Sequence, residues 1–332
     1  MASQETQVLD NIIASRRALL TGGGAALAAL AFTKPAAAAS TVTAYTDNDI
    51  LNFALNLEYL EANFYYLAAF GTNIYTTNSL YPAGASVMGI TGVGTQGVVV
   101  TKPTTCKVPF TSLAVASYAV ETAIEEGKHV AFLRTALGSK AVAQPQIDLF
   151  SSFNALASLA GIGPAFDPFA SDANFLVGAY IFEDVGVTAY KGAAPLITDK
   201  GTILPAAAGI LAVEAYHAGL VRTTINALDP NGTLGLLGYT QKISAVRTSA
   251  SQAAATGTKT VDDYGVQPQT VSLGGGANVT ATTIVDADPT NVIAFSRTTT
   301  QVLNIVTGGG AVTAGTAAKG VFFPNGLNGL FT

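Results

Sequence analysis

The sequence predicts a mainly α-helical protein built around a four-helix bundle. Four stretches carry helix-start and helix-stop signals, and each runs for about 23 to 27 residues, or roughly 35 to 40 Å at about 1.5 Å per residue. The only two histidines, His129 and His217, each follow a glutamate by three residues inside two of these stretches. Residues three apart share a face of a helix, so each pair presents a carboxylate and an imidazole together.

The first predicted helix covers residues 47–70. The Asp-Asn-Asp run at 47–49 supplies capping groups at its start, and Gly71 stops it. The next residues, about 71–110, are rich in Gly, Thr and Val. This composition predicts a long insert between the first and second helices, either a hairpin or an irregular segment.

The second predicted helix covers residues 111–137, and Gly138 lies just past its end. The residues from 138 to 171 separate it from the third helix. This connection is long enough to travel the length of a bundle, so we expect a crossover.

The third predicted helix covers residues 172–194 and is ended by Pro195, because proline disrupts a helix interior. Pro205 suits the first turn of a fourth helix, which runs to about Leu228. Residues 195–204 barely span a helix length even when extended, so the two helices should be antiparallel neighbours.

The chain divides into three predicted parts. Residues 1–39 form an export signal, residues 40–230 form the bundle, and residues 231–332 form an irregular C-terminal extension that packs on or beside it. The extension begins with a possible fifth helix at 241–255 and continues as a Gly-, Thr- and Val-rich tail without Glu or His. We interpret this tail as packing or interaction surface.

The N-terminus has the pattern of a twin-arginine export signal. Arg16 and Arg17 precede an apolar stretch from Leu19 to Phe32, and Ala37-Ala38-Ala39 offers a cleavage site before Ser40. The stretch is shorter than the roughly 20 residues of a membrane span. We therefore expect a mature chain without a transmembrane span, located in the periplasm, the cell envelope or outside the cell.

The composition is that of a mildly acidic, well-packed protein. Apolar residues make up 49%, charged residues 11%, and the net charge is -5. The 16 Lys and Arg residues are scattered, which argues against nucleic acid as a partner. Cys106 is the single cysteine, so no intrachain disulfide is expected. A homo-oligomer is one possible assembly.

The four helices repeat a pattern in pairs. In chain order it reads Glu58 with Tyr65, Glu126 with His129, Glu183 with Tyr190, and Glu214 with His217. In each Glu–Tyr pair the tyrosine lies seven residues on, about two turns along nearly the same face. One Glu from each of two helices and a Glu-x-x-His from each of the other two is the ligand set of di-iron and di-manganese bundles.

The chain resembles ferritin-like domain proteins. The run from Asp49 to Phe64 and the closing Phe322-Phe323-Pro324-Asn325-Gly326 are similar to the exported desiccation-related branch of that superfamily. The resemblance covers residues 47–228 and, more loosely, the tail. It implies a ferritin-like four-helix bundle with a carboxylate-bridged dimetal centre. The residues that match the ligand pattern are Glu58, Glu126, His129, Glu183, Glu214 and His217. The insert and the extension depart from a compact iron-storage ferritin, which puts cage assembly in doubt.

Converging carboxylates favour two bound metal ions, because each buried negative charge otherwise loses hydration worth roughly several kcal/mol. Carboxylate and imidazole together suit iron or manganese, with zinc a further candidate. Two functions follow as hypotheses. The centre reacts with oxygen or peroxide as an oxidase, ferroxidase or catalase, or the protein is a non-catalytic desiccation or stress-protection protein of the cell envelope.

Several neighbours of these residues have weaker assignments. Glu61 shares a face with Glu58 and is the alternative ligand from the first helix, although the matched spacing favours Glu58. Tyr65 and Tyr190 are candidates to donate hydrogen bonds to ligand carboxylates or to carry electrons. Three further acidic residues are candidates to orient the imidazoles. These are Glu121, Glu125 and Asp184.

Overall fold

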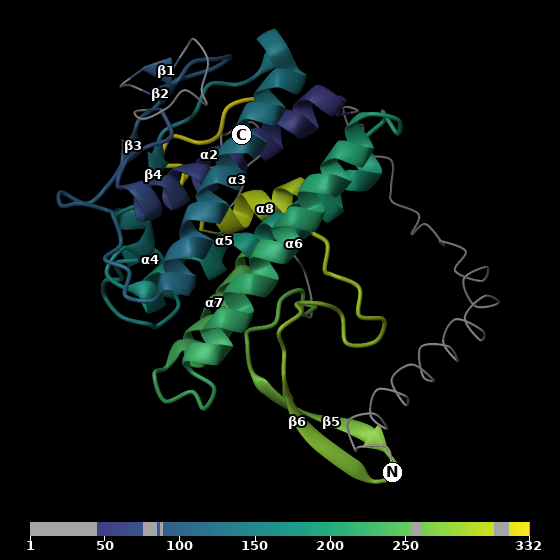
Figure 1. Cartoon of the computed structure of the whole chain (residues 1–332). Coiled ribbons are helices and arrows are strands. Elements are labelled where there is room, and N and C mark those ends of the chain that lie inside the picture. The colour runs from purple at the N-terminus through teal and green to yellow at the C-terminus, as the bar shows by residue number, and fades with distance from the viewer. Residues whose placement is uncertain (1–44, 76–84, 87–88, 254–259, 309–318, 332) are drawn as a thin grey trace. The chain divides into compact units, whose positions relative to one another are not determined.

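The computed structural model describes residues 45–75, 85–86, 89–253, 260–308 and 319–331, and Figure 1 shows its elements. The export signal predicted for residues 1–39 lies outside the described residues. The predicted fold class is confirmed, because long helices dominate the described chain and strands are few and short. Four long helices form the bundle. They are α2 (Asp47–Phe70), α3 (Leu113–Leu137), α5 (Asp172–Ala193) and α6 (Ile203–Leu228).

The start of α2 differs in detail from the expected capping. Thr46, one residue earlier, is the N-cap, and its hydroxyl accepts from the backbone N–H of Asp49 while Asp49 accepts in return from the Thr46 N–H at 2.9 Å. Asp47 is turned toward the loop between α5 and α6, where its carboxylate accepts from the N–H groups of Thr198 and Asp199 at 2.7 and 2.8 Å. Gly71 ends the helix in the left-handed conformation, as predicted.

Neighbouring helices of the bundle are antiparallel. α2 and α5 run in opposite directions, because Tyr65 contacts Glu183 while Glu58 contacts Tyr190. A 3-10 turn, η2 (Ala194–Leu196), follows α5 where proline was expected to stop it, and a short loop leads into α6. This α5–α6 pair is antiparallel as predicted, since Glu214 lies beside Gly186 while Arg222, further along α6, reaches Asp184, which lies earlier on α5.

The connection after α3 is the expected crossover. Asn52, near the start of α2, donates to the carbonyl of Lys140 just past the end of α3, so these two helices are antiparallel. α3 and α5 are therefore parallel, and the chain between them must travel the length of the bundle. It contains η1 (Gly138–Lys140), β4 (Ile147–Asp148) and α4 (Ser151–Leu159).

The insert between α2 and α3 lies against this crossover. Two strands of two residues each, β1 (Ala85–Ser86) and β2 (Gly89–Ile90), form a hairpin, which is followed by β3 (Val99–Val100). β3 pairs in parallel with β4 of the crossover. The insert thus contains both a hairpin and irregular chain, and it covers one side of the bundle (Figure 1).

The extension comprises α7 (Leu236–Ser251), a hairpin of β5 (Pro268–Gly274) and β6 (Ala277–Thr282), and α8 (Thr299–Val306). The fifth helix therefore begins five residues before the predicted 241, and it ends at Ser251. The reason for the early start is Asp229, whose carboxylate accepts from the N–H groups of Leu234 and Leu236 at 2.9 and 2.8 Å.

A buried network of arginines and aspartates joins the extension to α5 and α6. Arg247 of α7 reaches Asp184 at 3.0 Å and Asp263 at 2.7 Å, and Arg222 of α6 reaches Asp184 at 2.9 Å. Arg297 pairs with Asp263 at 2.9 Å. Because a buried ion is tolerated only when paired, these contacts fix the extension in one position.

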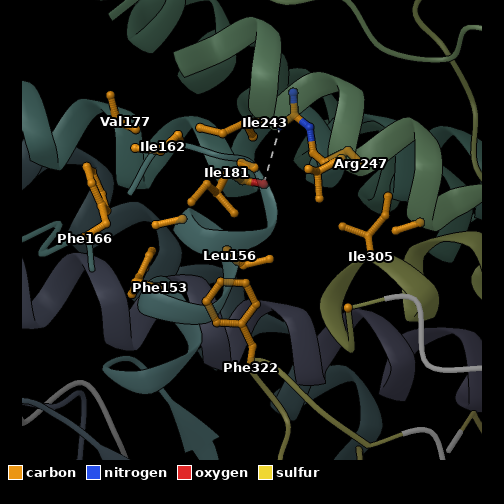
Figure 2. A pocket seen from close by; sticks show the side chains of 15 residues that line it. Phe153, Leu156, Ile162, Phe166, Val177, Ile181, Ile243, Arg247, Ile305 and Phe322 are labelled. Carbon is orange, nitrogen blue, oxygen red and sulfur yellow. Dashed lines mark hydrogen bonds between the residues drawn. The ribbon is translucent and has the colours of Figure 1, made fainter. Parts of the chain in front are cut away.

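An apolar pocket lies beside this network, between α4, α5, α7 and α8 (Figure 2). Phe153 and Phe322 line it, and their ring centroids are 5.5 Å apart. The Phe-Phe run of the C-terminal motif is thus part of the hydrophobic core, as the packing interpretation of the tail predicted. Cys106 is free and buried.

The four bundle helices differ in burial. α2 and α5 are buried along most of their lengths, whereas α3 and α6 each keep one face in solvent. α6 is the one described helix whose length and apolar composition would suffice to cross a membrane. In the structure it packs in the bundle, and Glu214 and His217 lie on its buried face.

Candidate metal centre

The structure brings all six predicted ligand residues together in the interior of the bundle. They form two groups that share Glu126. The His129 cluster contains Glu58, Glu126, His129 and Glu214, and the His217 cluster contains Glu126, Glu183 and His217. Within each group one potential ligand atom per residue lies within 4.8 Å of all the others. α2, α3, α5 and α6 each contribute, as the sequence pattern predicts.

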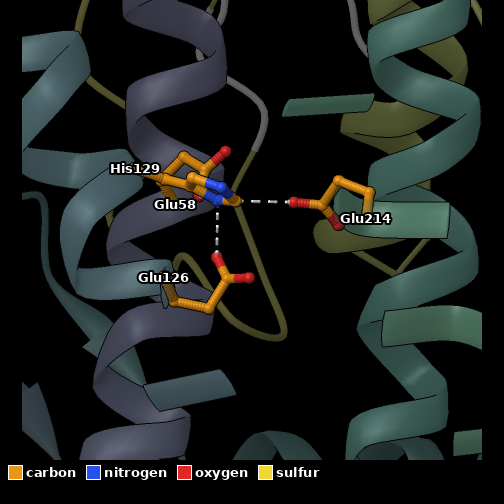
Figure 3. A group of neighbouring side chains, drawn as sticks. All are labelled: Glu58, Glu126, His129 and Glu214. Atoms are coloured by element: carbon orange, nitrogen blue, oxygen red, sulfur yellow. Dashed lines mark ion pairs between the residues drawn. The ribbon is translucent and has the colours of Figure 1, made fainter. Parts of the chain in front are cut away.

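In the His129 cluster the imidazole faces three carboxylates (Figure 3). Its Nδ1 lies 3.3 Å from Glu58 Oε2, 3.5 Å from Glu126 Oε2 and 3.9 Å from Glu214 Oε1. Figure 3 shows Glu214 approaching from the side opposite the other two. One ring nitrogen and three oxygens thus surround a common point.

In the His217 cluster the imidazole again presents Nδ1. It lies 3.0 Å from Glu126 Oε1 and 3.4 Å from Glu183 Oε2. Glu126 therefore points one oxygen at each imidazole. A carboxylate in this position can bridge two metal ions, which is the arrangement that the family resemblance implies.

Each of the two tyrosines on α2 and α5 donates a hydrogen bond to the glutamate of the other helix. Tyr65 donates to Glu183 Oε1, and Tyr190 donates to Glu58 Oε1. The seven-residue spacing had placed each tyrosine on the face of the glutamate of its own helix. Because the helices are antiparallel, each tyrosine instead meets the glutamate opposite. Each hydrogen bond occupies one carboxylate oxygen and leaves the other for the centre.

One of the three acidic neighbours orients an imidazole. Glu125 Oε2 accepts from His217 Nε2 at 2.8 Å, which fixes the ring with Nδ1 toward the cluster. Asp184 belongs instead to the arginine network, so its proposed role beside an imidazole is wrong. Glu121 is exposed on α3, one turn before Glu125.

Glu61 is buried next to the two clusters but belongs to neither. Glu58 supplies the α2 oxygen of the His129 cluster. Burial, together with the charges of Glu126 and Glu58, raises the pKa of Glu61 well above its usual value.

Burial and neighbouring charges shift the pKa values of most groups in the centre when no metal is bound. Burial, opposed by His129 and aided by Glu126, raises the pKa of Glu58 to about 7. Burial, with the charge of Glu61, raises the pKa of Glu214 well above its usual value. Burial opposes protonation of His129, but the charges of Glu58 and Glu126 outweigh it and raise its pKa to about 12. Divalent ions would replace these protons.

The donor atoms fit a metal pair. Within the described chain, both oxygens of Glu126 and of Glu214, one oxygen each of Glu58 and Glu183, and Nδ1 of both histidines are buried and make no hydrogen bond, so that their polar contacts are the ion-pair contacts among themselves. Buried polar atoms almost always have partners, so this concentration of unsatisfied lone pairs at one place calls for cations. Oxygen and imidazole donors suit iron or manganese.

Gly186 makes room for one of these ligands, a role that sequence reasoning missed. A Cβ at this position of α5 would overlap Oε2 of Glu214. The available signal was a glycine inside a predicted helix, which usually has a packing or functional reason. The backbone of α5 thus forms part of the cradle for the Glu214 carboxylate.

Comparisons with known proteins show the family to which the chain belongs. The chain is 29% identical over 274 residues to the desiccation-related protein PCC13-62 of Craterostigma plantagineum, covering 79% of this chain and 78% of that protein. It is 24% identical over 297 residues to the ferritin-like catalase Nec2 of Nesocodon mauritianus, covering 85% and 84%. No solved structure matched the chain. The model of the family described as "Ferritin-like domain" matches residues 46–227. This match spans all four helices of the centre and more than half of the chain, which therefore belongs to the ferritin-like domain family.

Proposed function

We propose that this protein binds two metal ions, iron or manganese, and uses them to decompose hydrogen peroxide. The position of Glu126 carries the proposal, because its two oxygens face the two imidazoles at 3.0 and 3.5 Å. Glu126 would help to hold both ions, and a metal pair would supply the redox chemistry that peroxide decomposition requires. The similarity to a protein named as a ferritin-like catalase supports peroxide as the substrate.

When bound, a redox-active metal pair supplies the two electrons that one peroxide accepts and a second peroxide returns, so that two peroxides yield two waters and one O2. The protein's own residues hold and orient the centre. Glu125 keeps His217 Nδ1 directed inward. Tyr65 and Tyr190 each donate a hydrogen bond to one oxygen of a ligand carboxylate. Burial excludes bulk water from both clusters.

The test is turnover by protein whose metal content is known. Protein from iron- or manganese-supplemented cells should contain about two ions per chain and should release half a mole of O2 per mole of peroxide. Glu126→Gln should lose both properties. Asp288→Asn, the same chemical change on the extension, should keep both. Stoichiometric metal without peroxide consumption would overturn the catalytic part of the proposal.

A non-catalytic protective role is the second candidate. It is favoured by the similarity to a desiccation-related protein, whose sequence identity to this chain is higher than that of the catalase. In this case the metal serves mainly to stabilise the fold by neutralising buried carboxylates. Chelation would then lower the melting temperature, while the loaded protein would consume neither peroxide nor oxygen.

We further propose that the protein is exported by the twin-arginine route. The support is the sequence pattern around Arg16 and Arg17. This route carries folded proteins, so a metal loaded in the cytoplasm would be exported with the chain. Fractionation of cells into cytoplasm, periplasm and medium, with the N-terminus of the mature protein determined, tests this proposal.

A further inference from the structure

A groove of about 610 Å³ runs between α3 and α6 on the surface of the bundle. α2 packs chiefly on α3 and α5 chiefly on α6, so the two exposed helices α3 and α6 are the partners between which space remains. Small residues keep that space open, because Ala215 and Gly219 of α6 line the groove. The groove differs from the apolar pocket of Figure 2 in its position and in the two carboxylates and the imidazole of its lining.

The groove leads to the metal centre. His217 and Glu125, which are hydrogen-bonded to each other at 2.8 Å, are both among its lining residues. The side chain of Glu125 is 38% exposed, whereas that of His217 is 5% exposed. Behind His217, its Nδ1 faces Glu126 and Glu183. The imidazole of His217 thus lies between the groove and the ligand atoms of the His217 cluster.

The lining of the groove carries negative charge. Glu121 and Glu125 lie one turn apart on the same face of α3, and both line the groove. None of the residues that line it, all within the described chain, is a lysine or an arginine. A concave surface with charges of one sign concentrates ions of the opposite sign and speeds their association.

We infer that this groove is the entrance through which hydrated divalent cations reach the buried centre, with Glu121 as the outer carboxylate that attracts them. The inference rests on the proposed function, because it concerns the loading of the same two clusters. It adds a route, a charge requirement and a steric requirement. Each requirement can be tested by the rate of metal uptake, independently of any catalytic activity.

The charge requirement is tested with Glu121→Gln. Metal-free protein is mixed with Co²⁺ in a stopped-flow instrument, and the visible absorption of bound Co²⁺ is followed. Glu121→Gln should load about threefold to tenfold more slowly at low ionic strength and reach the same final absorption. The difference should shrink in about 1 M salt, where the screening length is about 3 Å. Asp288→Asn, which removes a carboxylate outside the groove, should load at the wild-type rate.

The steric requirement is tested with a matched pair of glycines on α6. A Cβ at Gly219 or at Gly209 would meet no atom within 4 Å, so both helical sites accept a larger residue without a clash at Cβ. Only Gly219 lines the groove. Gly219→Phe should slow Co²⁺ uptake by at least tenfold, and Gly209→Phe should leave it unchanged. Circular dichroism of both variants checks that the bundle is intact.

The outcomes separate the inference from the proposed function. Wild-type protein that binds no stoichiometric Co²⁺ would refute the metal centre itself. Wild-type protein that binds two Co²⁺ while Glu121→Gln and Gly219→Phe load as fast as wild type would refute the entrance and leave the centre standing. Slow loading by both variants, with normal final occupancy and normal controls, supports the entrance.

Discussion

Replacing Glu126 with glutamine should remove both metal ions at once. Glu126 is the one residue that belongs to both clusters, with Oε2 near His129 and Oε1 near His217. Glutamine keeps the size of the side chain but removes its negative charge, and it turns one of the two oxygens into an N–H donor. One cluster therefore loses an oxygen ligand and both lose the shared charge.

The expected size follows from Coulomb's law. Opposite unit charges about 4 Å apart interact by about 4 kcal/mol at an effective dielectric constant near 20. A divalent ion roughly doubles this energy. If only a third of this interaction energy is lost after solvent and neighbouring charges adjust, the binding free energy of each ion falls by nearly 3 kcal/mol. Binding of each ion is then about 100-fold weaker, because about 1.4 kcal/mol corresponds to a factor of ten.

Metal analysis after desalting is the assay, supported by Co²⁺ titration for the affinities. Wild type should retain about two ions per chain and Glu126→Gln close to none. Glu58→Gln and Glu183→Gln serve as comparisons, because each alters one cluster alone and should retain about one. A Glu126→Gln protein that keeps one tightly bound ion would refute the shared position of this carboxylate.

Chelation should destabilise the protein more as the pH rises from about 5 to about 8. The pKa of Glu58, raised by burial from 4.5 to about 7, lies above its unfolded value, so its protonated form stabilises the metal-free protein fully below 4.5. That contribution is lost as the pH rises through 7, at up to about 1.4 kcal/mol per pH unit, while metal binding strengthens. Melting temperatures with and without chelator check this, and a difference that is constant over this range would contradict it. Gly186→Ala should displace the Glu214 carboxylate and lower the metal content from about two ions to about one. Unchanged metal content by elemental analysis would show that the cradle is not needed. Arg16→Lys combined with Arg17→Lys should leave the full-length precursor in the cytoplasm, and normal export in cell fractions would rule out the twin-arginine route.

The helices and their ligand register could be predicted from the sequence because their signals are local. Capping residues, prolines and glycines mark helix ends within a few residues of where they act, so the predicted bounds of α2, α3, α5 and α6 lie within two residues of those observed. The spacing of Glu126 to His129 and of Glu214 to His217 is fixed by helix geometry alone. The matched seven-residue spacing favours Glu58 over Glu61 as the ligand from the first helix, and this choice stays a prediction.

What the sequence by itself determined, then, is which residues share a face of one helix. Only the tertiary structure decided which faces meet. In the folded chain Glu125 contacts His217, and Asp184 contacts the buried arginines. Tyr65 and Tyr190 each bind the glutamate of the opposite helix, and a groove lies between α3 and α6. These outcomes depend on the direction, rotation and separation of helices that are far apart in the chain. Long-range packing sets those quantities, because no local pattern records the distance between two helix surfaces.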